Sequence, residues 1–65
     1  MAYRLIIHDE NYGTEYPSIV ATSLHDEEPP TEFVVDLVIE ECGQVAVLEI
    51  GEDDDFQTKY IMTIK

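Results

Sequence analysis

Positive charge is the first thing this sequence lacks, because its 65 residues contain three lysine and arginine side chains against 15 aspartates and glutamates. The formal net charge is −12 at pH 7. Direct binding of DNA, RNA or an anionic membrane depends on basic side chains that meet negative charge. We therefore expect no direct nucleic-acid or membrane partner, and we expect any macromolecular partner to present a basic surface.

Cysteine and long hydrophobic runs are also scarce. Cys42 is the one cysteine and cannot form an intramolecular disulfide, which indicates a reducing compartment. No run of 18 apolar residues occurs, and the apolar run at residues 5–7 is too short for a signal peptide. These absences predict a cytoplasmic protein, located in the host-cell cytoplasm if the chain is viral.

Combinations of residues that carry catalysis or hold a metal are equally rare. The candidate nucleophile and bases are Cys42, His8 and His25, and no catalytic motif surrounds any of them. One cysteine and two histidines fall short of the four ligands of a structural zinc site. The adjacent acids of residues 51–55 do not alternate as an EF-hand loop requires. We expect no enzyme activity, no bound metal and no cofactor.

The length and apolar content predict one folded domain spanning residues 1–65. A chain of this size is less than half of a typical domain of ~150 residues, so a second domain is excluded. Hydrophobic residues make up 45% of the chain, whereas disorder requires low hydrophobicity together with high charge. Small domains have little core to spare, so each apolar position is expected to contribute.

The N-terminal part of the chain is expected to form two strands. Residues 3–7 have the alternating pattern of a strand with one face buried. Asn11 and Gly13 supply turn chemistry, because glycine tolerates a positive φ and asparagine bonds its own backbone. Residues 19–24 then form a short second strand, and Pro17 precedes it where a missing N–H is tolerated.

The C-terminal part is expected to form a hairpin. A charged loop with two consecutive prolines, residues 25–31, marks the clearest internal boundary. Residues 45–50 are rich in β-branched side chains and predict a strand, residues 51–55 predict a turn, and residues 59–65 alternate as a final strand.

Residues 32–41 fit both a helix and a strand. In a helix, acids spaced by four residues share one solvent-facing stripe, with Thr31 as the N-cap and Gly43 at the C′ position. In a strand, apolar side chains at every second position from Phe33 fill one face. The several β-branched residues favour the strand, as does the negative charge of Glu40 and Glu41, which a helix C-terminus disfavours.

The predicted fold class is therefore a β-rich single small domain, an antiparallel meander or small barrel of about five strands. The alternative is an α+β domain in which one helix, at about residues 31–42, packs on an antiparallel sheet.

The acids are not spread evenly along the chain. All 15 lie between Asp9 and Asp55, whereas the three basic residues lie outside that span. If the two terminal strands pair with each other, they form a neutral to basic stripe. Because alternate turns of a meander share an end, the acids are expected to gather at two poles.

The charge density is comparable with that of nucleic acid. Duplex DNA carries one charge per ~1.7 Å, so ~20 Å of duplex presents ~12 phosphates, close to the net charge of this chain. In size, charge and apolar content the chain resembles the acidic DNA-mimic inhibitors of bacteriophages, such as antirestriction, anti-CRISPR and uracil-glycosylase inhibitor proteins. No sequence motif supports that resemblance. It implies a protein that binds and blocks the basic site of a nucleic-acid-handling protein.

The expected contact residues are ten acids and two tyrosines from acidic loops, because tyrosine is a frequent interface anchor. They are Asp26, Glu27, Glu28, Glu32, Asp36, Glu40, Glu52, Asp53, Asp54, Asp55, Tyr12 and Tyr16. The competing hypothesis is an assembly module that forms a homodimer or larger homo-oligomer through an exposed strand edge, at residues 3–7 or 59–64, with the charge serving solubility only.

Overall fold

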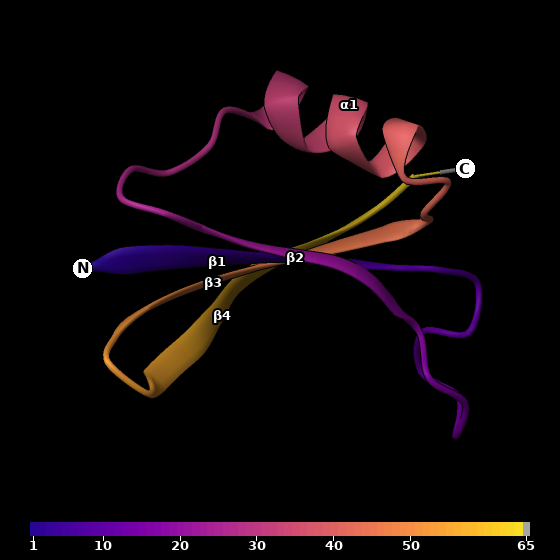
Figure 1. The fold of residues 1–65 in the computed structure, drawn as a ribbon, viewed down its shortest axis with the longest axis horizontal. Helices are drawn as coiled ribbons and strands as arrows, with labels where there is room; N and C mark the ends of the chain where they lie inside the picture. The colour runs from indigo at the N-terminus through magenta and orange to yellow at the C-terminus, as the bar shows by residue number, and fades with distance from the viewer. Residues whose placement is uncertain (65) are drawn as a thin grey trace.

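Four strands and one helix make up the computed structural model, which describes residues 1–64 (Figure 1). Their bounds are β1 Ala2–His8, β2 Ile19–His25, α1 Thr31–Glu40, β3 Val45–Glu52 and β4 Asp55–Thr63. The fold is thus α+β and β-rich, with one helix packed on an antiparallel sheet, as the alternative interpretation predicted. No helix within residues 1–64 is long and apolar enough to cross a membrane.

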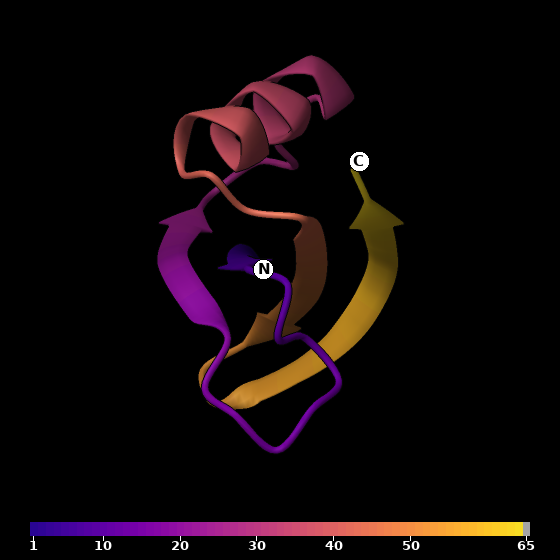
Figure 2. The same ribbon diagram turned by 90° about the vertical axis from the view of Figure 1, so that its right-hand side faces the viewer.

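The sheet has the strand order β2-β1-β3-β4, and every neighbouring pair is antiparallel. Strand β1 is central: Leu5 pairs with Ser23 on one side and with Leu48 on the other. Helix α1 connects β2 to β3 and lies across one face of the sheet (Figures 1 and 2). The two terminal strands do not pair with each other, because β3 lies between β1 and β4, so the condition stated for a neutral to basic stripe is not met.

The preferred prediction of a fifth strand at residues 32–41 is wrong, because this segment is helical. Val34 and Val38, four residues apart, are both fully buried on the side of α1 that faces the sheet. Burying a valine side chain stabilises the fold by about 1.5–3 kcal/mol, whereas its lower helix propensity costs a few tenths of a kcal/mol. Packing against the sheet therefore outweighs the preference of β-branched residues for strands.

The ends of α1 also differ from the predicted caps. Pro30, rather than Thr31, is the N-cap residue, and no side chain of residues 1–64 makes a capping hydrogen bond there. At the C-terminus the left-handed residue is Cys42, with φ 56°, and the Gly43 N–H donates to the Val38 carbonyl at 2.8 Å. Gly43 is needed for a different reason, since a Cβ atom there would lie 2.5 Å from the Ile7 Cγ2.

The core lies between α1 and the sheet. Its fully buried side chains come from β1, α1 and β3 and are Leu5, Ile7, Val34, Val38, Ala46 and Leu48. Tyr60 and Met62 of β4 pack against this cluster at its margin. The alternation predicted for residues 3–7 is confirmed, because Leu5 and Ile7 are fully buried and the residues on either side of them are not. The strand predicted at residues 45–50 is also confirmed, and its first four residues, Val45–Leu48, are all buried.

The predicted strands and turns are confirmed with small shifts in their bounds. Gly13 has a φ of 86° in the segment between β1 and β2, as its turn chemistry predicted. The C-terminal hairpin turns at Asp53 and Asp54, between Glu52 of β3 and Asp55 of β4. Strand β4 begins four residues before the predicted strand at 59–65, and Lys65 lies outside the described residues.

Candidate functional site

The carboxylates form an almost entirely exposed acidic surface. Of the 15 acids, only Asp9 and Glu49 are half-buried, and the other 13 are exposed. The ten acids and two tyrosines predicted as contact residues are all among the exposed residues. The structure thus leaves each predicted contact residue accessible to a partner.

These acids gather at the two ends of the sheet. The turn between β3 and β4 and the segment between β2 and α1 lie at the same end as the N-terminus (Figure 1). We call this the eight-acid end, after Asp26, Glu27, Glu28, Glu32, Glu52, Asp53, Asp54 and Asp55. The opposite, five-acid end carries Asp9, Glu10, Glu15, Glu40 and Glu41. Asp36 lies along the helix and Glu49 within the sheet.

Both basic side chains of the described residues are engaged by glutamates. The Arg4 guanidinium donates to Glu49 Oε1 at 2.7 Å and lies 4.3 Å from the centre of the Phe56 ring. Lys59 donates to Glu28, which ties the segment before α1 to strand β4. These pairs leave the other exposed carboxylates with no lysine or arginine partner within residues 1–64.

The Lys59–Glu28 contact also affects ionisation at the edge of the core. The hydrogen bond from Lys59 to Glu28 raises the pKa of the lysine. Burial, reinforced by the negative charge of Glu28, raises the pKa of the Tyr60 hydroxyl. Both groups therefore hold their protons more firmly in the folded protein.

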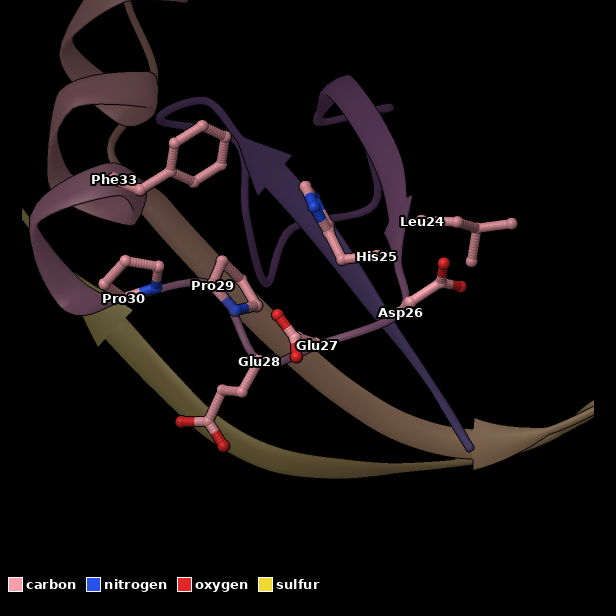
Figure 3. A pocket seen from close by; sticks show the side chains of 8 residues that line it. All are labelled: Leu24, His25, Asp26, Glu27, Glu28, Pro29, Pro30 and Phe33. Carbon is pink, nitrogen blue, oxygen red and sulfur yellow. The ribbon is translucent and has the colours of Figure 1, made fainter.

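A shallow hollow lies between the end of β2 and the start of α1 (Figure 3). Its apolar wall includes the half-exposed Phe33 ring, which meets the His25 ring edge-on with 5.6 Å between centroids. Carboxylates of Asp26, Glu27 and Glu28 stand on its rim. An aromatic ring beside carboxylates is a surface that can accept a lysine or arginine side chain.

The two tyrosines predicted as anchors lie in different settings. The Tyr12 ring packs on His8, with 4.6 Å between ring centroids, and is 38% exposed. Tyr16 is 63% exposed, and its backbone N–H donates to Thr14 Oγ1. Both lie in the segment that runs on the opposite side of the sheet from α1 (Figure 2). The structure does not bring them next to the eight-acid end.

Each histidine is paired with a serine, a feature that sequence reasoning missed. His8 Nδ1 lies 2.8 Å from Ser18 Oγ, and His25 Nε2 lies 2.8 Å from Ser23 Oγ. Within residues 1–64 neither histidine hydrogen-bonds to the carboxylate that completes a serine–histidine–acid triad. The same residues contain no group of three or more histidine, cysteine or acidic side chains placed to hold a metal ion.

The free edges of the sheet only partly match the predicted ones. Residues 3–7 cannot offer an exposed edge, because β1 is paired on both sides. Strand β4 is an edge, as the prediction for residues 59–64 requires, and β2 is the other. The sequence signal for β2 is its seven-residue run without a charge or a proline, Ile-Val-Ala-Thr-Ser-Leu-His.

The fold and the surface define this chain as a small acidic α+β protein with a four-stranded antiparallel sheet. Comparison with protein-family models, curated proteins and solved structures finds no match. The geometry and charge of the chain are therefore what indicate its function.

Proposed function

We propose that this chain is a small protein-binding inhibitor whose carboxylates take the place of nucleic-acid phosphates in the basic site of a nucleic-acid-handling protein. The supporting observation is that the charge exposed on the surface is almost entirely negative. Thirteen carboxylates are exposed, and Arg4 and Lys59 each form an ion pair with a glutamate. The proposed setting is the cytoplasm, and the proposed role is counter-defence of the kind associated with phage DNA mimics.

The dimensions of the molecule support a comparison with duplex DNA. Its longest extent is 29 Å, over which a duplex carries about 17 phosphate charges. The net charge of −12 is about two-thirds of that number. A basic cleft that binds DNA would therefore meet a field of the same sign and similar strength, on a surface held in place by a folded sheet.

The experiment is affinity capture of the tagged chain from cell extract at low salt, followed by elution with duplex DNA or with increasing NaCl. The expected result is a basic nucleic-acid-binding protein that both DNA and salt release, because the acidic surface and the duplex compete for one site. Capture that resists both treatments would contradict the proposal.

A matched pair of variants then locates the contact. The first carries Asp53→Asn, Asp54→Asn and Asp55→Asn at the eight-acid end, and the second carries Glu10→Gln, Glu15→Gln and Glu41→Gln at the five-acid end. Each changes the net charge from −12 to −9 by removing three charges. The first is expected to slow association with the captured protein about tenfold at low salt, and the second less. Equal association rates for both variants would contradict the placement of the contact at the eight-acid end.

A further inference from the structure

Strand β2 is an unprotected edge of the sheet. It pairs with β1 on one side, and no element of residues 1–64 lies beyond it on the other (Figure 2). Within residues 1–64, no loop donates or accepts a backbone hydrogen bond at Ile19–His25. The backbone groups on its outer side are therefore free to pair with an added strand.

The other edge strand is protected in the usual ways. Strand β4 carries Asp55 and Lys59, and a bulge interrupts its pairing at Leu48 and Glu49. Charges and bulges of this kind discourage the addition of a strand. Strand β2 has neither between Ala21 and His25, where its pairing with β1 is regular.

The side chains along β2 also suit an added strand. Ile19 and Leu24 pair with His8 and Arg4 on the sheet face opposite α1 and are 60% and 68% exposed. On the helix side, the hollow lined by His25 and Phe33 opens at the C-terminal end of the strand (Figure 3). A neighbouring strand would bury the apolar pair on one face and place a side chain near the hollow on the other.

The charges around β2 indicate which kind of strand would add to its free edge. The acid-free strand is bounded by Glu15 before it and by Asp26, Glu27 and Glu28 after it. Two copies joined antiparallel through β2 would bring residues 26–28 of each copy toward Glu15 of the other, and each copy carries a charge of −12. Like charges that meet in this way are unfavourable, whereas arginine or lysine at both ends of an incoming segment would pair with these acids.

We infer that β2 is the docking edge for an extended segment of the partner protein, apolar in its middle and basic at both ends, which adds to the sheet as a fifth strand. This inference deepens the proposed function, on which it rests, because it names the element that holds the partner. Main-chain hydrogen bonds supply affinity in this mode of recognition, and the flanking charges supply specificity.

The test uses synthetic peptides that are independent of any captured protein. The probe alternates valine and threonine and carries two arginines at each end, and its control has the same side chains with N-methylated valines. At low salt the probe is expected to protect β2 amides from hydrogen exchange, and the control to bind at least about tenfold more weakly because it lacks the N–H donors. A probe that fails to bind, or a control that binds equally well, would overturn the inference.

Two variants of the protein separate the edge from the overall charge. Leu24→Lys and Ile61→Lys both replace a mostly exposed side chain on the same sheet face, at opposite edges, and both add one positive charge. Leu24→Lys is expected to weaken probe binding at least about fivefold and Ile61→Lys by no more than about twofold. Equal losses would show that charge, not the β2 edge, governs binding.

Other outcomes distinguish this inference from the proposed function. Suppose that DNA still displaces the chain from the captured protein, but that this protein binds the Leu24→Lys variant as tightly as wild type. The docking edge on β2 is then refuted, while the proposed inhibitor function still stands. If the wild-type chain forms a dimer by light scattering and Leu24→Lys is a monomer, a second copy occupies the edge and the inference is overturned.

Discussion

At the scale of single residues, Leu48 is a central side chain of the core. Its side chain is fully buried in β3, opposite Leu5 of the central strand and in the cluster that includes Val38 of α1. A leucine in this position contacts both layers of the fold, so the surrounding side chains cannot close over the space it would leave.

Leu48→Ala is expected to lower the free energy of unfolding by about 2–5 kcal/mol, because it removes buried apolar surface and leaves a cavity. Urea denaturation followed by circular dichroism measures the loss. Leu24→Ala is the control: that side chain is 68% exposed, and its truncation should change stability by no more than about 0.5 kcal/mol. Similar losses for the two leucines would contradict the assignment of the core.

Tyr60 links stability to alkaline pH. Burial raises the pKa of its hydroxyl, so the folded state retains a proton that the unfolded chain releases from about pH 10. Its contribution is fully present below that pH and is lost as pH rises through the folded-state pKa. The pKa of Lys59, raised by its hydrogen bond to Glu28, acts in the same direction.

We expect the free energy of unfolding to fall from about pH 10 upward, and the fall to be shallower in Tyr60→Phe. Denaturation curves between pH 8 and pH 11.5, at constant ionic strength, measure it. Tyr16→Phe, which removes an exposed hydroxyl elsewhere, serves as the control and should retain the wild-type slope. An unchanged slope in Tyr60→Phe would rule out this hydroxyl as a contributor.

Helix α1 has an acidic side chain near each end, and only the one at the C-terminal end opposes the helix dipole. Glu32 lies in the first turn, where negative charge is favourable, but Glu40 lies in the last turn, and no basic residue occurs there. Both side chains are exposed, so a lysine can replace either one without repacking the core.

Glu40→Lys is expected to be more stable than Glu32→Lys by about 1 kcal/mol, because the same charge change improves one helix end and worsens the other. The two variants have equal net charge, so any relief of overall repulsion is similar in both. Thermal unfolding at low salt measures the difference. The reverse order of stability would mean that local contacts, rather than the dipole, control the helix ends.

The strands could be predicted from the sequence because their signals are local: alternation in residues 3–7 and 59–65, and β-branching in residues 45–50. The state of residues 32–41 could not be predicted in this way. The apolar residues of that segment fit the period of a helix and the period of a strand. In the helix the buried residues are Val34 and Val38, whereas in the alternative strand they would be every second residue from Phe33. The helix is favoured by its contacts with side chains such as Leu5 and Leu48, which are distant in sequence. A pattern within ten residues does not contain that information.

The acidic surface could also be predicted, but the β2 edge could not. Charged side chains on turns are exposed in almost any fold, and all ten predicted acids are exposed. Edge position depends on the order β2-β1-β3-β4, which pairs Tyr3 with both His25 and Ile50. That order places residues 3–7 at the centre and leaves Ile19–His25 at the margin.

At the scale of the whole molecule, the carboxylates repel one another over a range that salt controls. Screening extends over about 30 Å at 10 mM ionic strength and about 8 Å at 150 mM. The protein measures 29 × 27 × 16 Å, so at low salt both acidic ends interact with each other, and at higher salt repulsion is confined within each end.

The melting temperature is therefore expected to rise as NaCl is increased from 10 to 150 mM, because the compact state gains more from screening than the expanded one. Thermal melts followed by circular dichroism test this. The variant with asparagine at positions 53, 54 and 55 should show a smaller rise. A melting temperature that falls with salt would mean that the ion pairs of Arg4 and Lys59 outweigh the repulsion.

The central place of β1 has a consequence for how the chain folds. Ala2 pairs with Gly51 and His8 with Val45, so one side of β1 is completed by residues from the far end of the sequence. The hairpin of β3 and β4 can form locally, but its docking on β1 must close a long loop, which slows folding. During synthesis β1 cannot complete its pairing until Val45–Glu52 of β3 has left the ribosome, so one edge of β1 stays exposed to aggregation during that interval.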